Sequence, residues 1–394
     1  MKLRKQIRSA AFFAGALALI PFGSYSALQR HIVDGTIVKT VSQGRFIIGE
    51  KDDAGYISWQ VANLKHAPPA RPAVYLLGGS SMRECIPSAA SLSDAVKARC
   101  ETRPAVKMLA SSVQDYARAL AIIDNLPAAR GGIVVLGVHH AQFASPRGSA
   151  KDELKGIDLL MKSPALRDFV ARRLGGHPTN NLREGLRIYL NEYRARRDAE
   201  PFRGRAVAYH QHRYSSAHIW SNGAKRWRLD YWLEGKGRPG GEFDTYFAFN
   251  AACLTECVKL ARARGFEVLL MECPQNAFIV KDAFDRYKKK YRPLCTTLVD
   301  EQDAHYSDLN QTAGLTNMDF RDLYHLVEPG RAQWQPKLAD ALAQIVTDHI
   351  ETATPSSSPS PATSASGPEP PASSTGPLTG LFGAVIASQA NAER

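Results

Sequence analysis

The sequence predicts an α/β fold built on a doubly wound, mostly parallel sheet. Short, continuous apolar runs predict the strands, because a strand that is covered on both faces shows no polar alternation. Longer segments with helical character separate these runs, so strand and helix alternate along the chain, as they do in parallel sheets with right-handed crossovers. The strands are expected at 73–79, 106–110, 132–138 and 266–273.

Each expected helix has an identifiable end. The segment 113–127 runs into Pro127, which cannot continue a helix. The segment 245–265 stops at Gly265, a residue that commonly ends helices. A last helix is expected within 335–352, where it closes the folded part of the chain.

The α/β domain is expected in two parts, 30–150 and 245–352. Residues 151–244 interrupt its rhythm and carry 19 Lys and Arg against 12 Asp and Glu. We predict that they form a basic, aromatic-rich and largely helical insertion or cap, with its best helical pattern at 181–200. Residues 353–394 are rich in Pro and Ser, a composition that is typical of a disordered tail.

The N-terminus has the pattern of an export signal. Residues 9–28 carry no charge and are mostly apolar. They follow a basic head of four residues, Lys2, Arg4, Lys5 and Arg8. As an uncleaved signal anchor, residues 1–29 would make the chain a single-pass protein of the cell membrane, with its domain outside the cytoplasm. Cleavage near 24–26 would instead make it a secreted protein.

Charge and cysteine content limit the expected partners. A net charge of +12 favours anionic partners. Export leaves glycan or lipid rather than nucleic acid, for which no recognition motif is present. The six cysteines suit disulfides outside the cytoplasm, but the sequence does not choose among the pairings. No histidine pair joins them at zinc-ligand spacing, so neither a metal nor another cofactor is expected.

A turn of small residues follows the first expected strand, where Gly78, Gly79, Ser80 and Ser81 come directly after 73–77. Open α/β sheets bind ligands at the carboxyl ends of their strands, and glycine lets the chain turn sharply there. A serine in this place would expose its hydroxyl near the start of the next helix, whose N–H groups can stabilise an oxyanion. The alternative is a plain tight turn in which a serine caps the helix.

A nucleophilic serine needs a base and a carboxylate that orients the base. Asp322 and His325 stand three residues apart near the end of the α/β region, before the last helix. On a helical turn this spacing puts both side chains on the same side. The pair is therefore a candidate for the base and its orienting partner.

The combination of a Gly-Gly-Ser turn after the first strand and a late Asp-x-x-His resembles the SGNH, or GDSL-like, hydrolase superfamily. The resemblance covers roughly 70–150 and 246–350 and leaves out the insertion and the tail. It implies that Ser80 is the nucleophile, in preference to the serine that follows it. It also implies that His325 is the base and that Asp322 orients it.

Two further blocks of the family are matched less closely. The family has a glycine after its second strand whose N–H joins the oxyanion hole, and Ser111 or Ser112 stands there. The family's third block is Gly-x-Asn, and it ends in His139 here. A neutral imidazole donates one N–H, although with another geometry than the amide; alternatively, His139 is a polar residue at the sheet edge. The resemblance thus implies Gly79, Ser112 and His139 as oxyanion or substrate residues.

Other residues have both a functional and a structural interpretation. Arg83 and Glu84 follow the expected nucleophile, and they either serve the site or pair locally on a helix. Gln275 and Asn276 follow the fourth expected strand, and they either bind substrate or cap the next helix. Four aromatic residues of the insertion either stack on sugar rings or fill its core: Trp220, Trp227, Tyr231 and Trp232.

The resemblance and the export signal favour an extracytoplasmic serine esterase or O-acyltransferase. Its substrate would be an acylated cell-envelope glycan or a small acyl ester. Envelope members of the superfamily, such as the alginate O-acetylation proteins, imply a membrane-bound O-acyltransferase as a partner. The alternative is a catalytically weak SGNH-like binding or assembly protein of the envelope, which the replacement of Asn by His139 supports.

Overall fold

The structure is a computed structural model, and it describes residues 72–112, 114–127, 132–151, 163–175, 214–234 and 242–351, with a few residues between 23 and 69. All of these residues belong to one compact unit, Met1–Thr354. The predicted tail, the helical pattern at 181–200 and nearly all of the predicted export signal lie outside the described residues. Within the described part of the chain, no helix is long and apolar enough to span a membrane.

Five parallel strands form one sheet in the order β2-β1-β3-β4-β5. Their bounds are Ala73–Leu77 for β1, Ala105–Met108 for β2, Gly132–Val138 for β3, Phe266–Glu272 for β4 and His305–Ser307 for β5. The chain steps from β1 outward to β2 and then returns across β1 to β3, so the winding direction reverses there, as in doubly wound sheets. The predicted α/β class and its parallel sheet are confirmed.

The edge strand β5 is the one strand that the sequence does not predict. It has three residues, all half-buried, and it pairs with β4 alone. A strand this short and polar carries no apolar run. Its position next to β4 fixes it, rather than its own composition.

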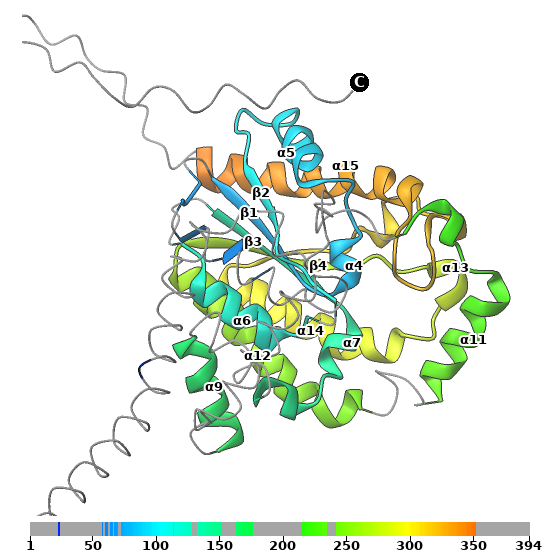
Figure 1. Ribbon diagram of the computed structural model, residues 1–394, viewed down its shortest axis with the longest axis horizontal. Coiled ribbons are helices and arrows are strands. Elements are labelled where there is room, and N and C mark those ends of the chain that lie inside the picture. The colour runs from blue at the N-terminus through cyan, green and yellow to red at the C-terminus, as the bar shows by residue number, and fades with distance from the viewer. Residues whose placement is uncertain are drawn as a thin grey trace, which may run out of the picture. The chain divides into compact units, whose positions relative to one another are not determined.

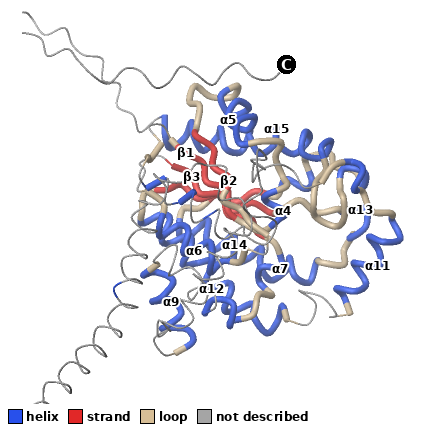
Figure 2. Tube along the Cα trace, viewed as in Figure 1, coloured by secondary structure: helices blue, strands red, loops and turns tan. Residues whose placement is uncertain are grey.

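Helices cover both faces of the sheet (Figure 1). In the tube view the strands lie between two groups of helices (Figure 2). On one face α5 packs against α15, and on the other α12 packs against α6 and α14. The longer helices are α5 Ala89–Lys97, α6 Tyr116–Asn125, α9 Pro164–Leu174, α11 Asn222–Leu233, α12 Phe243–Ala263, α14 Asp285–Gln302 and α15 Glu328–Ile345. The shorter ones are α4 Ser80–Arg83, α7 His140–Phe143 and α13 Ala277–Val280, with the 3₁₀ turns η2 Ser216–His218, η3 Leu309–Gln311 and η4 Asn317–Asp319 and the π-helical end η5 Val346–Glu351.

Successive side chains of β1 point to opposite faces of the sheet, and both faces are covered, which explains the continuous apolar run. Tyr75 and Leu77 belong to the hydrophobic core on one face of the sheet, and Val74 and Leu76 to the core on the other. All four side chains are fully buried. Because both faces are covered, neither set is replaced by polar residues.

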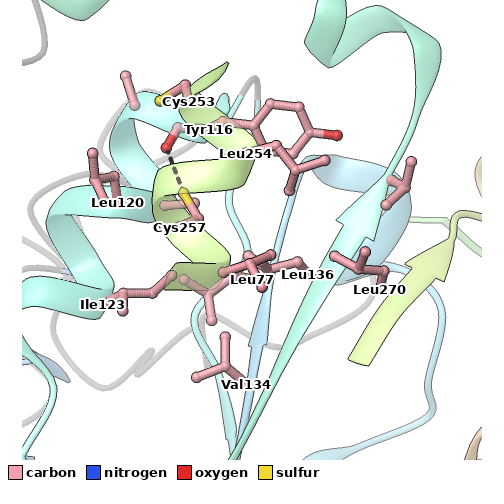
Figure 3. Packing of buried hydrophobic residues seen from close by; sticks show 14 of the residues in the cluster. Leu77, Tyr116, Leu120, Ile123, Val134, Leu136, Cys253, Leu254, Cys257 and Leu270 are labelled. Carbon is pink, nitrogen blue, oxygen red and sulfur yellow. Dashed lines mark hydrogen bonds between the residues drawn. The ribbon is translucent and has the colours of Figure 1, made fainter. Parts of the chain in front are cut away.

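Figure 3 shows the packing on the face that α12 covers. Leu77, Leu136 and Leu270 lie on neighbouring strands, and Leu254 of α12 belongs to the same fully buried cluster. Burial of one such side chain stabilises the fold by about 1.5–3 kcal/mol. This packing holds the strands rigidly and thereby fixes the carboxyl edge, where the candidate site lies.

The helix boundaries follow the predicted signals. The side chain of Asp115 accepts the N–H of Arg118 at 3.0 Å and caps the start of α6, which ends shortly before Pro127. Helix α12 ends just before Gly265, whose φ of 82° is a conformation that glycine adopts without strain.

The described parts of the insertion pack in two places. Helix α9 contacts α6 and α12, while α11 contacts α13 (Figure 1). Both are helical, as predicted for this region. Helix α11 therefore lies beside the segment that follows β4, which is the carboxyl edge of the sheet.

All six cysteines lie in the described part of the chain, and no disulfide joins any two of them there. Five are buried and Cys100 is half-buried. The disulfides that the sequence left open do not form among these residues.

Candidate active site

The turn after β1 presents Ser80 at the carboxyl edge of the sheet. Gly78 has a φ of 147°, which residues with side chains rarely adopt, and a Cβ there would lie 3.1 Å from the Cβ of Met82. Its N–H donates to the side-chain oxygen of Gln114. Ser80 is the first residue of α4 and is half-buried, whereas Ser81 is buried.

Ser80, His325 and Asp322 form a continuous hydrogen-bonded chain. The Nε2 atom of His325 lies 2.8 Å from the Oγ of Ser80. On the other side of the ring, Nδ1 lies 2.8 Å and 2.9 Å from the two carboxylate oxygens of Asp322. These distances let His325 act as a base toward Ser80 while Asp322 fixes its tautomer.

The Asp-x-x-His pair lies on a tight loop rather than on a helical turn, which was the wrong local structure to expect. The loop opens and closes with an antiparallel bridge between Phe320 and Leu326. At its tip a carboxylate oxygen of Asp322 accepts the N–H groups of Tyr324 and His325, both at 3.0 Å. The Asp322 carboxylate therefore stabilises the fold of this loop and holds the ring of His325 against its own oxygens.

Asp322 is held ionised in spite of its burial. Burial alone would raise the pKa of Asp322, but the imidazole of His325, hydrogen-bonded to the carboxylate, and the loop N–H groups of Tyr324 and His325 lower it to about 2. The guanidinium of Arg321 lies 3.5 Å from the carboxylate as well. A charged carboxylate is the form that can stabilise an imidazolium during proton transfer.

His139 offers an unused hydrogen-bond donor near His325. Its Nδ1 accepts the N–H of Ala141 at 3.2 Å, so it caps the start of α7. Burial and, to a lesser extent, the nearby His325 lower the pKa of His139 to about 3, so the ring is neutral. The proton of the neutral ring then lies on Nε2, an atom that is buried and has no hydrogen-bond partner among the described residues.

The two other expected oxyanion positions flank the same turn. Among the described residues, none beyond its chain neighbours has an atom within 4 Å of a Cβ placed on Gly79, so these residues leave space beside it. The N–H of Ser111 donates to the carbonyl of Gly78 at 3.0 Å, which removes Ser111 from the two alternatives after the second strand. Ser112 accepts a 2.8 Å hydrogen bond on its Oγ from Arg83.

Arg83 and Glu84 do pair locally, but the pair extends further than the sequence indicates. The Nε of Arg83 lies 3.1 Å from Glu84, and Arg331 of α15 lies 3.7 Å from the other oxygen of Glu84. Arg331 also donates twice to the carbonyl of Tyr214, at 3.1 and 3.2 Å. The ring of Tyr214 stands edge-on to that of His325, with centroids 5.1 Å apart. No sequence pattern links these residues, because they are distant in the chain.

The remaining candidates divide between support and surface. Asn276 does not cap α13 with its side chain; it donates to the carbonyl of Asp322 at 3.2 Å instead. Trp232 packs on Tyr324 behind the site, whereas Trp227 is 61% exposed and stacks on Tyr231. The side-chain Nε2 atom of Gln275 is buried and makes no hydrogen bond to the described residues.

The described residues contain no group of three or more His, Cys, Asp or Glu side chains arranged to hold a metal ion. A serine hydroxyl paired with an imidazole and a buried carboxylate can attack a carbonyl and form an acyl-enzyme. No protein-family model matches the chain, and no curated protein matches it.

Proposed function

We propose that the chain is an SGNH-type serine esterase or O-acyltransferase that acts on acyl esters. The observation that carries the proposal is the pair of hydrogen-bonding distances at His325, 2.8 Å to Ser80 and 2.8 Å to Asp322. The three residues come from opposite ends of the described chain. They meet at the sheet edge where open α/β folds bind their ligands.

In the proposed mechanism Ser80 attacks the acyl carbonyl while the Nε2 of His325 takes the hydroxyl proton. Asp322 stabilises the imidazolium that forms. When the tetrahedral intermediate collapses, the ester C–O bond breaks, and His325 gives the proton to the departing alcohol. An acyl-serine remains, and water or a sugar hydroxyl then attacks it with His325 again as the base.

The negative oxygen of the intermediate needs donors. The N–H of Ser80 has no acceptor within α4, because it belongs to the first turn of that helix. We assign the second donor to the Nε2–H of His139 and the third to the N–H of Ser112. A preorganised donor of this kind typically contributes about 100- to 1,000-fold to the rate.

We further propose that the enzyme works outside the cytoplasm on cell-envelope glycans, with a membrane-bound O-acyltransferase as its partner. This part rests on the export pattern of residues 1–29 and on the basic composition of 151–244. The alternative, a binding or assembly protein with little catalysis, rests on His139 where the family has asparagine. Measured ester turnover distinguishes the enzyme from the binding protein.

The test is p-nitrophenyl acetate turnover by the full chain in detergent micelles, with Ser80→Ala and Ser81→Ala as a matched pair. Both variants remove one hydroxyl from adjacent positions of α4. Ser80→Ala should lower turnover by about 10⁵- to 10⁶-fold. Ser81→Ala should stay within about tenfold of wild type, or about 1.4 kcal/mol of transition-state stabilisation. Equal activity in wild type and Ser80→Ala would refute the proposed function.

A further inference from the structure

Four consecutive backbone carbonyls of the loop that carries Asp322 and His325 accept hydrogen bonds from residues outside the loop. They belong to Phe320, Arg321, Asp322 and Leu323. Asn276 holds the last two through its side-chain amide at 3.2 Å and its backbone N–H at 2.9 Å. The first two are held by the insertion. Lys225 Nζ donates to Phe320 at 2.9 Å, and the Trp220 N–H donates to Arg321 at 2.8 Å.

Lys225 is the unusual residue among these donors, because it is a lysine with no exposed surface. Its ammonium group has three N–H donors, and three acceptors surround it. They are the carbonyl of Phe320 and, at 2.9 and 3.0 Å, the backbone and side-chain oxygens of Asn317. A buried charge is tolerated when it is fully hydrogen-bonded. Burial lowers the pKa of Lys225, and the carboxylate of Asp322 opposes that shift.

The hydrogen bonds of Lys225 and Asn276 are connected through Asn317. The side-chain oxygen of Asn317 accepts from Lys225 and, at 2.9 Å, from the Nδ2 of Asn276. The same Nδ2 reaches the carbonyl of Asp322. A continuous hydrogen-bonded path thus runs from helix α11 of the insertion to the backbone of the residue that orients His325.

We infer that Lys225 is a positioning residue, through which helix α11 of the insertion keeps the Asp322–His325 loop aligned with Ser80. This inference rests on the proposed function of the triad. Misplacing a reacting group by about 1 Å can cost about 100-fold in rate, even when the substitution lies outside the chemistry. Without the ammonium, the carbonyl oxygens of Phe320 and Asn317 lose the donor that Lys225 supplies, and the side-chain oxygen of Asn317 keeps only its bond from Asn276. The loop then has to move to find other donors.

The test compares Lys225→Met with Leu229→Ala in the full chain in detergent micelles. Methionine has an unbranched side chain similar to the four-carbon stem of lysine but lacks the ammonium and its three donors. Leu229 is buried on the same helix, so its truncation destabilises α11 while leaving those donors in place. For p-nitrophenyl acetate, Lys225→Met should lower kcat about 10- to 100-fold with KM within about twofold. Leu229→Ala should lower Tm by about as much as Lys225→Met does, but it should keep kcat within about threefold of wild type.

A second readout needs no turnover. The proton shared between His325 Nδ1 and Asp322 should give a low-field proton NMR resonance in the wild type, in Ser80→Ala and in Leu229→Ala. It should be lost or shifted in Lys225→Met. Retention of the wild-type resonance in Lys225→Met, or a kcat no lower than that of Leu229→Ala, would overturn the inference. An active Ser80→Ala variant would instead remove the proposed function, and the resonance would still decide whether Lys225 positions the loop.

Discussion

The two halves of the candidate site are held in different ways. The Ser80 turn is built by the sheet itself, since Gly78 ends β1 and Gln114 reaches it from the segment after β2. The loop with Asp322 and His325 has a backbone that is held by Lys225 and other residues outside it. The Ser80 half of the candidate site is thus positioned by the parallel sheet, whereas the Asp322–His325 half is positioned by tertiary contacts from the insertion and from Asn276.

The two halves should therefore respond differently to substitution. The turn depends on a glycine conformation and a fully buried strand, so damage to it should cost fold and function together. The loop depends on separate hydrogen bonds from several elements, so its alignment should be lost in steps while the sheet stays intact. Substitutions in the two halves should therefore separate stability from rate.

The largest expected effect breaks the link between the halves. Ser80→Ala and His325→Ala should each lower turnover by about 10⁵- to 10⁶-fold, because either change abolishes the covalent route. The double variant should be little worse than either single one, as measured by kcat with p-nitrophenyl acetate. Additive losses in the double variant would show that the two residues do not act as a unit.

Asp322→Asn should be milder, because the base remains but loses its orientation. A loss of about 10⁴-fold in kcat is expected from the change of tautomer. The variant should keep the fold of the sheet, which near-ultraviolet circular dichroism would report. A loss as large as that of His325→Ala would mean that the carboxylate does more than orient the ring.

The next effect concerns His139, the proposed hydrogen-bond donor to the oxyanion. His139→Ala should lower kcat by about 100- to 1,000-fold, since it removes a buried N–H donor. His139→Asn supplies an amide donor instead and should stay within about tenfold of wild type. If both variants match wild type in kcat, His139 only caps α7.

The smallest effect is on stability in acid, and it belongs to the loop. The pKa of Asp322 is about 2 in the folded chain and about 4 when unfolded. Its contribution of about 2 kcal/mol is therefore complete above pH 4 and is lost as the pH falls through 2. Urea unfolding of wild type and Asp322→Asn should give a stability difference that narrows over this range. A difference that is constant with pH would contradict the assignment.

The sequence predicts the Ser80 half of the candidate site well, because its signals are local. An apolar run, two glycines and a serine are contiguous, and four of the five strands overlap their predicted ranges. The edge strand β5 escapes prediction, because it is short and polar and depends on its neighbour β4.

The sequence predicts the other half less completely. The Asp-x-x-His spacing identifies Asp322 and His325, although on a loop instead of a helix. The roles of Lys225 and Arg331 escape notice, because each is one basic residue among many until the fold buries it against carbonyls more than ninety positions away. Asn276 is singled out in sequence, but its place under Asp322 depends on the same tertiary contacts.

Covalent labelling reports whether Ser80 is an activated nucleophile. A fluorophosphonate probe reacts with a serine whose hydroxyl is activated by a base, and peptide mass spectrometry identifies the serine. The hydrogen bond of 2.8 Å to His325 predicts labelling at Ser80 in wild type and in Ser81→Ala, and its loss in His325→Ala. Labelling at Ser81 instead, or no labelling of a folded wild-type chain, would show that His325 does not activate Ser80.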